Sequence, residues 1–247
     1  MILLFTDFGL ESPYSGQVKL VLRRDAPGIP VIDLCADLAP FRPLEAGYLL
    51  AALRHDIPAG AVCLCVVDPG VGAERRPVIL HADGRWYVGP DNGLLDAVAS
   101  IGADVQWWEI GWRPQSLSAS FHGRDLFAPV AARLATGIAP DRSSSNIRLT
   151  RHVDVAAELS AVIYIDRYGN CITGLRAAGL SHATTVSVKG TDIAHARIFS
   201  AVPAGQPFWY ENSLGQVELA VNQGHAAQLL QLTVGDWIAL RPAAAAS

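Results

Sequence analysis

A carboxylate at the end of an apolar stretch is the first candidate for chemistry in this sequence. Asp68 follows residues 61–67, Ala-Val-Cys-Leu-Cys-Val-Val, whose apolar and β-branched side chains predict a buried strand. A Pro-Gly pair then predicts a tight turn, and Arg75 and Arg76 follow soon after. Because ligands of open α/β sheets bind beyond the carboxyl ends of the strands, Asp68 stands where chemistry is expected. The alternative is a turn aspartate that caps its own backbone beside two solvated arginines.

Further polar motifs are predicted at other strand ends of the same region. Asp7 stands in Thr-Asp-Phe-Gly, Asp91 in Gly-Pro-Asp-Asn-Gly, and His122 begins His-Gly-Arg-Asp. Each has an ordinary explanation, since aspartates form turns and a single histidine is often structural. Their recurrence at one sheet edge favours a shared site, where Asp68, an arginine and His122 can converge. A carboxylate, a guanidinium and an imidazole can together hold a water molecule and accept its proton.

Alternating strands and helices over about the first 135 residues must position these groups. The predicted strands are 2–5, 31–35, 61–67 and 105–110, the predicted helices are 14–24, 44–55, 92–100 and 125–136, and a hairpin joins 78–82 to 86–88. This alternation predicts an α/β domain with a three-layer, mostly parallel sheet.

The composition changes after this region, and a two-domain chain is expected. The α/β N-terminal domain spans 1–140, a polar linker without periodicity spans 141–158, and a C-terminal domain spans 159–247. In the last part, short apolar segments alternate with glycine turns, at 161–165, 171–173, 184–189, 217–221 and 237–240. This pattern predicts a small β-barrel or sandwich.

Two polar motifs interrupt the apolar pattern of the C-terminal domain. One contains Tyr168 and Asn170, and the other contains Ser213 and Glu218. An aromatic ring beside an asparagine offers a stacking face and a matched donor and acceptor, which suits a purine. Two β-turns with Asx-type caps explain the same residues without any ligand, and from the residues alone this simpler interpretation is slightly favoured.

Composition limits the class of protein. The chain has 247 residues, of which 51% are hydrophobic and 17% charged, so general disorder is excluded. A net charge of −4 argues against a nucleic-acid surface, and no apolar run approaches the ~18 residues of a membrane span. No signal peptide is visible before the first strand. The four cysteines, Cys35, Cys63, Cys65 and Cys171, lack a C-x-x-C spacing and indicate small core residues in a reducing cytoplasm.

Six motifs that occur in order carry a family resemblance over nearly the whole chain. They are TDFG at 6–9, VDPGVG at 67–72, GPDNG at 89–93, FHGRDLFAPVAA at 121–132, IDRYGNCIT at 165–173 and NSLGQVELAVNQGHAA at 212–227. Together they resemble the S-adenosyl-L-methionine (SAM) hydroxide adenosyltransferase family, a sister group of the fluorinase and the chlorinase.

The resemblance implies an α/β N-terminal domain, a C-terminal β-barrel and a homotrimer whose active sites lie between subunits. It implies hydrolysis of SAM at C5′ by in-line attack of a positioned water, which gives adenosine and L-methionine without metal or organic cofactor. Carried over by position, the implied site residues are the water-positioning triad of Asp68, Arg75 and His122, with Asp7 at the ribose hydroxyls, Tyr168 and Asn170 at the adenine, and Ser213 and Glu218 at the methionine moiety. Only the family pattern prefers Arg75 to Arg76.

The chain departs from the family pattern at one position and keeps it at another. Many members carry asparagine where Gly174 stands, so any contact from that side chain is absent here. Halogenating relatives lack the histidine of the fourth motif, whereas this chain has His122, which points to water rather than halide as the nucleophile. Two other functions stay open: a metal-dependent phosphohydrolase that uses the same carboxylates and His122 as ligands, and a nucleoside- or SAM-binding module without catalysis. The sulfonium configuration of the substrate also stays open.

Overall fold

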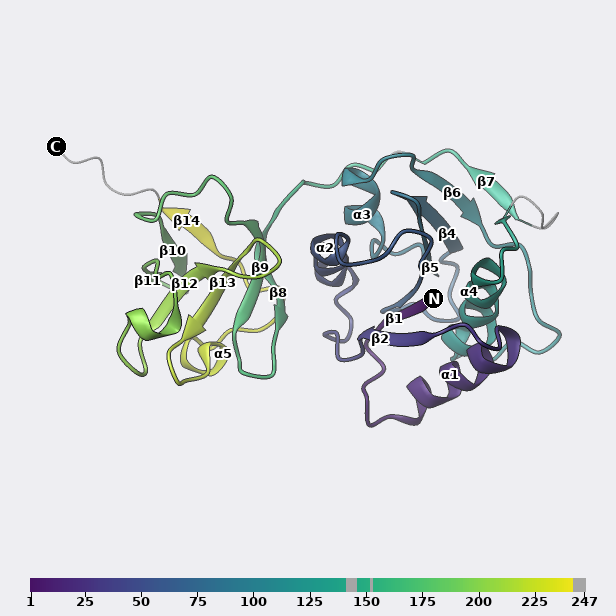
Figure 1. The fold of residues 1–247 in the computed structure, drawn as a ribbon, viewed down its shortest axis with the longest axis horizontal. Helices are drawn as coiled ribbons and strands as arrows, with labels where there is room; N and C mark the ends of the chain where they lie inside the picture. The colour runs from purple at the N-terminus through teal and green to yellow at the C-terminus, as the bar shows by residue number, and fades with distance from the viewer. Residues whose placement is uncertain (141–145, 152, 242–247) are drawn as a thin grey trace. The chain divides into compact units, whose positions relative to one another are not determined.

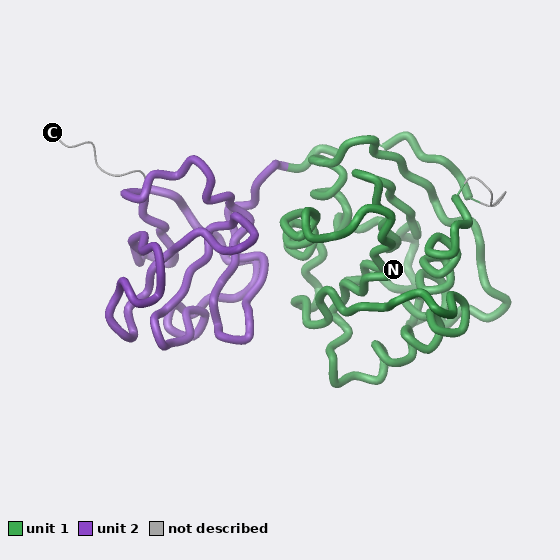
Figure 2. The backbone as a smooth tube through the Cα atoms, viewed as in Figure 1, with its two compact units in different colours: residues 1–155 green, residues 156–247 purple. Residues whose placement is uncertain are grey.

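The chain divides into two compact units, residues 1–155 and 156–247 (Figure 2). The computed structural model describes residues 1–140, 146–151 and 153–241. Part of the expected linker, residues 141–145, therefore lies outside the described residues. The following residues, Ile147–Leu149, form strand β7 and pair with β6 (Gln106–Glu109), so this part of the expected linker belongs to the first sheet.

The first unit alternates strands and helices as the sequence predicts (Figure 1). In chain order its other elements are β1 (Ile2–Thr6), α1 (Pro13–Asp25), β2 (Val31–Cys35), α2 (Pro43–Leu53), β3 (Val62–Val66), β4 (Pro77–Ala82), β5 (Arg85–Pro90), α3 (Asp96–Ile101), and a π-helical turn, Gly123–Phe127, that continues into α4 (Ala128–Ala135). Helix α3 begins four residues later than expected. The Asn92 side chain instead accepts a hydrogen bond from the Leu94 N–H, and Gly93 takes a φ of 95°, so these residues form a turn.

The strands of this unit form one sheet in the order β2-β1-β3-β5-β4-β6-β7. Strands β2, β1, β3 and β5 pair in parallel, and β4 adds antiparallel pairs with β5 and β6. Five of the seven strands in the described part of the chain, β1, β2, β3, β5 and β6, consequently point the same way. The prediction of a mostly parallel sheet is confirmed.

Helices cover both faces of the sheet, with α1 and α4 on one side and α2 and α3 on the other (Figure 1). Alternation along the strands decides which residues face which helices. Leu4 and Leu64 pack in one buried cluster with Val18 and Leu22 of α1. Full burial of each such side chain stabilises the fold by roughly 1.5–3 kcal/mol. This packing holds the carboxyl ends of the parallel strands in fixed positions.

Buried cysteines occupy the centre of the sheet. Cys63 and Cys65 of β3 are fully buried and free. Burial raises the pKa of the Cys63 thiol to about 12, with a small opposing effect from the charge of Arg85. Both thiols are therefore neutral core groups, as their spacing predicts.

The second unit is built from short strands. Its elements are β8 (Leu159–Ile165), β9 (Cys171–Arg176), β10 (Thr185–Val188), β11 (Thr191–Ile193), a 3-10 turn (Phe199–Ala201), β12 (Pro207–Glu211), β13 (Gln216–Val221), α5 (Ala226–Leu229) and β14 (Ala239–Arg241). They form a four-stranded sheet, β12-β13-β9-β8, and a three-stranded sheet, β11-β10-β14. Isolated bridges from Ala161 to Trp237 and from His195 to Trp209 join the two sheets at both edges. The hydrogen-bonded order thus returns to its start, which makes this unit a small β-barrel.

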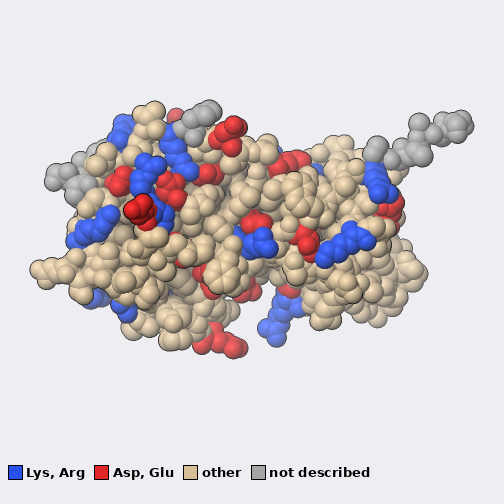
Figure 3. Space-filling model, turned by 180° about the vertical axis from the view of Figure 1, so that it is seen from behind, with Lys and Arg blue, Asp and Glu red and all other residues tan. Residues whose placement is uncertain are grey.

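The surface of the described residues gives two further observations. Basic and acidic side chains are interspersed on the face shown in Figure 3 rather than gathered by sign. No helix within the described ranges is long and apolar enough to cross a membrane.

Candidate active site

The loop between β3 and β4, residues 67–76, holds a buried ion pair. The guanidinium of Arg75 binds the Asp68 carboxylate through two nitrogens. Nε lies 3.0 and 2.9 Å from the two carboxylate oxygens, and Nη2 also donates to Oδ2. The two side chains are only 10% and 4% exposed, and Arg75 stacks over the ring of Phe127 at 5.3 Å. Bidentate charge-assisted hydrogen bonds fix the plane of the carboxylate. The carboxylate of Asp68 is therefore held in one orientation.

His122 completes this cluster. Its Nδ1 lies 3.0 Å from Nη2 of Arg75. Because a guanidinium only donates, Nδ1 must accept, and the ring proton lies on Nε2. Burial, followed by the positive charge of Arg75, lowers the pKa of His122 from its ordinary value. The imidazole is consequently neutral at neutral pH and presents an N–H donor.

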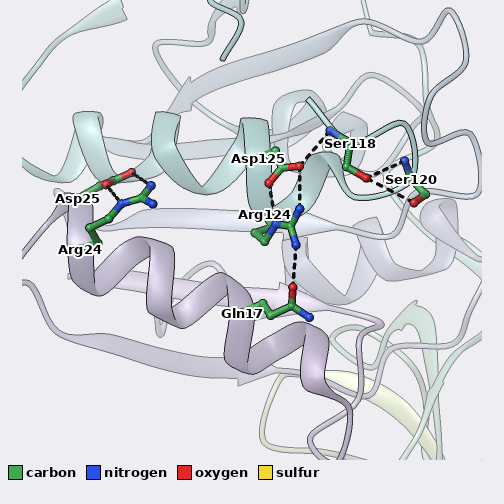
Figure 4. Close-up of polar contacts among 7 residues, drawn as sticks. All are labelled: Gln17, Arg24, Asp25, Ser118, Ser120, Arg124 and Asp125. Atoms are coloured by element: carbon green, nitrogen blue, oxygen red, sulfur yellow. Dashed lines mark hydrogen bonds and ion pairs between the residues drawn. The ribbon is translucent and has the colours of Figure 1, made fainter. Parts of the chain in front are cut away.

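Neighbouring polar contacts hold the segment that carries His122 (Figure 4). The Ser118 N–H donates to Asp125 Oδ2 at 3.0 Å, and Arg124 Nε donates to Asp125 Oδ1 at 2.6 Å. Arg124 Nη1 reaches across to Gln17 of α1, with 2.7 Å between Nη1 and Oε1. These bonds tie the start of the π-helical turn to both the preceding loop and α1, so the position of His122 is fixed by its surroundings.

Two glycines allow the close packing of the loops around the cluster. A Cβ at Gly123 would lie 2.8 Å from the ring of Phe8, and a Cβ at Gly72 would lie 2.5 Å from the carbonyl oxygen of Ala119. Gly72 also has a φ of 82°, which disfavours any side chain. A larger residue at position 72 would push the loop that carries Asp68 away from the segment before His122, and one at position 123 would push against Phe8, the neighbour of Asp7.

Asp7 follows β1, directly beside the strand that leads to Asp68. Burial raises its pKa to about 6, and the negative charge of Asp68 adds to this effect, while a hydrogen bond to its own backbone opposes it. Its backbone N–H donates to the Val66 carbonyl at 3.3 Å. Four sequence-predicted residues, Asp7, Asp68, Arg75 and His122, therefore belong to one sheet edge.

The structure also separates the two adjacent arginines. Arg75 contacts Asp68 and His122, whereas Arg76 turns to Asp91, with 3.2 Å between Nη2 and Oδ2. The geometry thus favours Arg75 for the cluster, a choice that spacing alone left open.

The second unit carries a cavity of about 990 Å³. All four predicted residues of this unit, Tyr168, Asn170, Ser213 and Glu218, line it. Glu218 is buried, and both of its oxygens are bonded, Oε1 by Tyr210 OH at 2.6 Å and Oε2 by Asn212 Nδ2 at 2.8 Å.

Asp166 adds a second carboxylate to the cavity lining. Its Oδ1 accepts the N–H groups of Tyr168 and Asn170 at 2.8 and 2.9 Å, and its Oδ2 accepts the Asn170 side chain at 3.1 Å. Asp166 therefore orients the turn that carries the aromatic ring and the amide. With Glu218 it gives the cavity two negative groups, which suits a positively charged ligand. Sequence reasoning missed Asp166, Tyr210 and Asn212, although Asp166 and Asn212 lie within two of the six motifs and Tyr210 stands two residues before one of them.

Gly174 has a packing reason in this chain. A Cβ there would lie 2.6 Å from both the side chain and the carbonyl oxygen of Leu159 on β8. An asparagine at this position would therefore require β8 to shift.

A metal site at the sheet edge does not match the geometry. The Arg75 guanidinium occupies the place between Asp68 and His122 that a shared cation would need. Across the part of the chain that the structure describes, no group of three or more His, Cys, Asp or Glu side chains is arranged to hold a metal ion.

Comparison with known families identifies the chain. The profile of the SAM hydroxide adenosyltransferase N-terminal domain matches residues 2–144, and that of the C-terminal domain matches residues 160–239. This chain belongs to the SAM hydroxide adenosyltransferase family. The expected family is therefore confirmed in both units.

Curated relatives of this SAM hydroxide adenosyltransferase extend over almost its whole length. An (R)-S-adenosyl-L-methionine hydrolase from Thermus thermophilus is 40% identical over 248 residues, covering 93% of this chain and 95% of the relative. One of the same name from Salinispora arenicola is 37% identical, covering 94% of each chain. A fluorinase from Actinopolyspora mzabensis is more distant, at 24% identity with 95% coverage of both.

A solved structure supports the fold of this SAM hydroxide adenosyltransferase. The crystal structure of an uncharacterized conserved protein from Thermotoga maritima is 32% identical and aligns with a TM-score of 0.85, covering 97% of this chain and 99% of that one.

Proposed function

We propose that this enzyme hydrolyses SAM of R configuration at the sulfonium. The oxygen of a water molecule attacks C5′, the C5′–S bond breaks, and the products are adenosine, L-methionine and a proton. The observation that carries the proposal is the buried Asp68–Arg75–His122 cluster in a chain 40% identical to an (R)-S-adenosyl-L-methionine hydrolase.

Hydrolysis of SAM requires few catalytic groups, and the Asp68–Arg75–His122 cluster can supply them. Methionine leaves as a neutral thioether, so no acid is needed to protonate the leaving group. The main requirement is one water molecule aligned with the C5′–S bond. Such alignment alone can lower a barrier by ~7–11 kcal/mol.

The geometry also favours one route for the proton. Nδ1 of His122 is occupied by Arg75, and Nε2 already carries a proton, so His122 orients water by donating to it. Asp68 keeps free lone pairs on oxygens that Arg75 holds in place. Asp68 is then the proton acceptor, with a contribution of about 10²–10⁴ to the rate.

Contacts to the substrate are assigned from the positions of these residues in the family motifs. Asp7 binds the ribose hydroxyls, Tyr168 and Asn170 hold the adenine, and Ser213 and Glu218 lie at the methionine end. The two carboxylates of the barrel cavity, Asp166 and Glu218, support this assignment because SAM carries positive charge on sulfur and on its ammonium group.

A homotrimer with active sites between subunits is part of the proposal. Leu10 and Phe41, which lie beyond the ends of β1 and β2, are 69% and 76% exposed, and Tyr168 of the barrel cavity is 76% exposed. Exposed apolar side chains of this size, among them Leu10 close to Asp7 in the chain and Tyr168 in the lining of the barrel cavity, support surfaces that another subunit covers. A cytoplasmic location agrees with Cys63, Cys65 and Cys171, which are buried thiols outside any disulfide.

The decisive experiment incubates purified protein with each SAM epimer, with and without a chelator, and separates the products by chromatography. Conversion of the R epimer to adenosine and methionine, unaffected by chelation, supports the proposal. Tight binding without turnover would instead indicate a binding module, and loss of activity with chelator would indicate a metal enzyme.

A further inference from the structure

The Gly-Pro-Asp-Asn-Gly motif at 89–93 contributes no side chain to the triad or to the barrel cavity. Its first two residues, Gly89 and Pro90, end β5, which lies beside β3 in the sheet. Gly89 packs so closely against the carbonyl of Cys65 that a side chain there would overlap it. The motif is therefore pressed against the point where the chain leaves β3 and enters the loop 67–76.

Asn92 bonds the start of that loop. Its Nδ2 donates to the carbonyl oxygen of Val67 at 2.8 Å, and its Oδ1 accepts from the Leu94 N–H at 3.3 Å. Val67 is fully buried and directly precedes Asp68. With both ends of its amide engaged, Asn92 fixes the peptide plane from which Asp68 departs.

Asp91 bonds the end of the same loop. Its backbone N–H donates to the Arg76 carbonyl at 2.8 Å, and its carboxylate pairs with the Arg76 guanidinium at 3.2 Å. The Asp91 side chain is only 10% exposed, and its other oxygen is bonded by Arg151. Arg76 directly follows Arg75, so these bonds fix the backbone from which the triad arginine departs.

We propose that Asp91 and Asn92 are positioning residues of the triad. Asn92 holds the Asp68 end of the loop 67–76 and Asp91 holds the Arg75 end, so that the two side chains meet in their bidentate arrangement. The loop itself contains Gly70 and Gly72 and has few internal hydrogen bonds to hold it. The inference rests on the proposed function, because alignment of the attacking water is what the loop geometry determines.

The ion-pair network around Asp91 supplies a matched control. Arg151 bonds Asp91 and also Asp96, at 2.7 and 2.9 Å from the two oxygens of the latter, and stacks over Trp107 at 4.6 Å. Asp96 is thus a partly buried carboxylate with the same arginine partner. Unlike Asp91, it has no bond to the loop 67–76 among the described contacts.

The test compares Asn92→Ala and Asp91→Asn with Asp96→Asn, using steady-state hydrolysis of SAM by the full-length protein. Misplacement of reacting groups by about 1 Å costs on the order of 10²-fold. We expect kcat to fall by about tenfold to hundredfold in the first two variants, with KM within about twofold of wild type. Asp96→Asn should keep wild-type kcat. Thermal unfolding of each variant gives the temperature range in which it is folded for the assay.

A second readout needs no substrate. Burial and the charges of Arg75 and Arg113 lower the pKa of His122, whereas the charges of Asp68 and Asp125 raise it, so displacement of Arg75 or of Asp68 should change that pKa. Titration of the His122 ring by NMR should show a changed pKa in Asn92→Ala and Asp91→Asn but not in Asp96→Asn. Asp91→Asn preserves side-chain shape and carries the test alone if Asn92→Ala does not fold.

The outcomes separate this inference from the proposed function. Wild-type kcat and an unchanged His122 titration in both loop-end variants would overturn the positioning role, as would an equal loss in Asp96→Asn. Absence of turnover by the wild-type protein would overturn the proposed function, and the NMR titration would still decide the positioning role.

Discussion

Nη2 of Arg75 bonds both Oδ2 of Asp68 and Nδ1 of His122, so a single nitrogen atom joins the carboxylate to the imidazole. A guanidinium offers only donors, and this bond therefore dictates the histidine tautomer. The same nitrogen places a permanent positive charge against the ring.

The tautomer is directly measurable. Nitrogen-15 NMR of His122 at pH 7 should show a neutral ring with the proton on Nε2. Because burial and Arg75 lower its pKa, the ring should titrate below the ordinary 6.5. A lowered pKa stabilises the fold above pH 6.5, and this contribution is lost as the pH falls through the lowered value. A proton on Nδ1 would contradict the hydrogen bond from Arg75.

Removing the carboxylate should separate turnover from binding. Asp68→Ala deletes the group that we propose aligns the water and takes its proton, while the barrel cavity keeps its side chains. The rate at saturating SAM should fall by about 10²–10⁴, with a much smaller change in affinity by calorimetry. Hydrolysis by Asp68→Ala at the wild-type rate would show that the sheet-edge cluster is not the catalytic centre.

Asp7 should make stability and substrate affinity depend on pH in opposite directions. Its folded pKa of about 6 lies above the unfolded value of 3.8, so its contribution to stability is fully present below pH 3.8 and is lost as the pH rises through 6. Asp7→Asn should therefore raise the melting temperature more at pH 8 than at pH 4. The proposed binding of the ribose hydroxyls by Asp7 uses the ionised carboxylate, so KM should rise in the wild type as the pH falls below about 6.

A melting temperature of Asp7→Asn that shifts equally at both pH values would argue against the raised pKa. Asp37→Asn is a suitable control for the general effect of removing one negative charge, because Asp37 also lies beyond a strand of the same sheet.

The assembly can be tested by weakening its proposed contact surface. Light scattering at micromolar concentration should give about three times the chain mass of 26.3 kDa. Phe41→Asp places a charge on a side chain that is 76% exposed, so it should dissociate the trimer and abolish hydrolysis with little change in monomer folding. A wild-type protein that runs as a fully active monomer would refute the assembly.

Sequence reasoning located Asp68 because apolar strand patterns and the rule for parallel strand ends are both local and general. The same rule was wrong for His122, which follows no strand: β6 ends at Glu109, and His122 stands at the start of the π-helical turn. Sequence reasoning could not separate Arg75 from Arg76, since adjacent residues share a loop and their directions depend on Asp91 and His122 far along the chain. That distinction exists only once the sheet brings β5 beside β3.

The barrel was harder to foresee than the sheet. Strand β12, Pro-Phe-Trp-Tyr-Glu, begins with proline and ends beside the polar motif, and β11 has only three residues. The barrel closes through two isolated backbone bridges, at Ala161 and His195. A single bridge produces no periodic pattern in the sequence. Asp166 and Tyr210 were missed for a related reason. Their role is to hydrogen-bond Asn170 and Glu218 in the cavity lining, and these contacts appear only in the folded structure.

Three buried thiols give this protein an internal reporter of its own unfolding. Cys63 and Cys65 lie in the first unit and Cys171 in the second, all fully buried, and burial raises the pKa of both Cys63 and Cys171 to about 12. A thiol that is both neutral and buried is not alkylated in the native state. The rate at which each thiol is modified therefore measures how often its own unit opens, so the two units can be followed separately without adding any label.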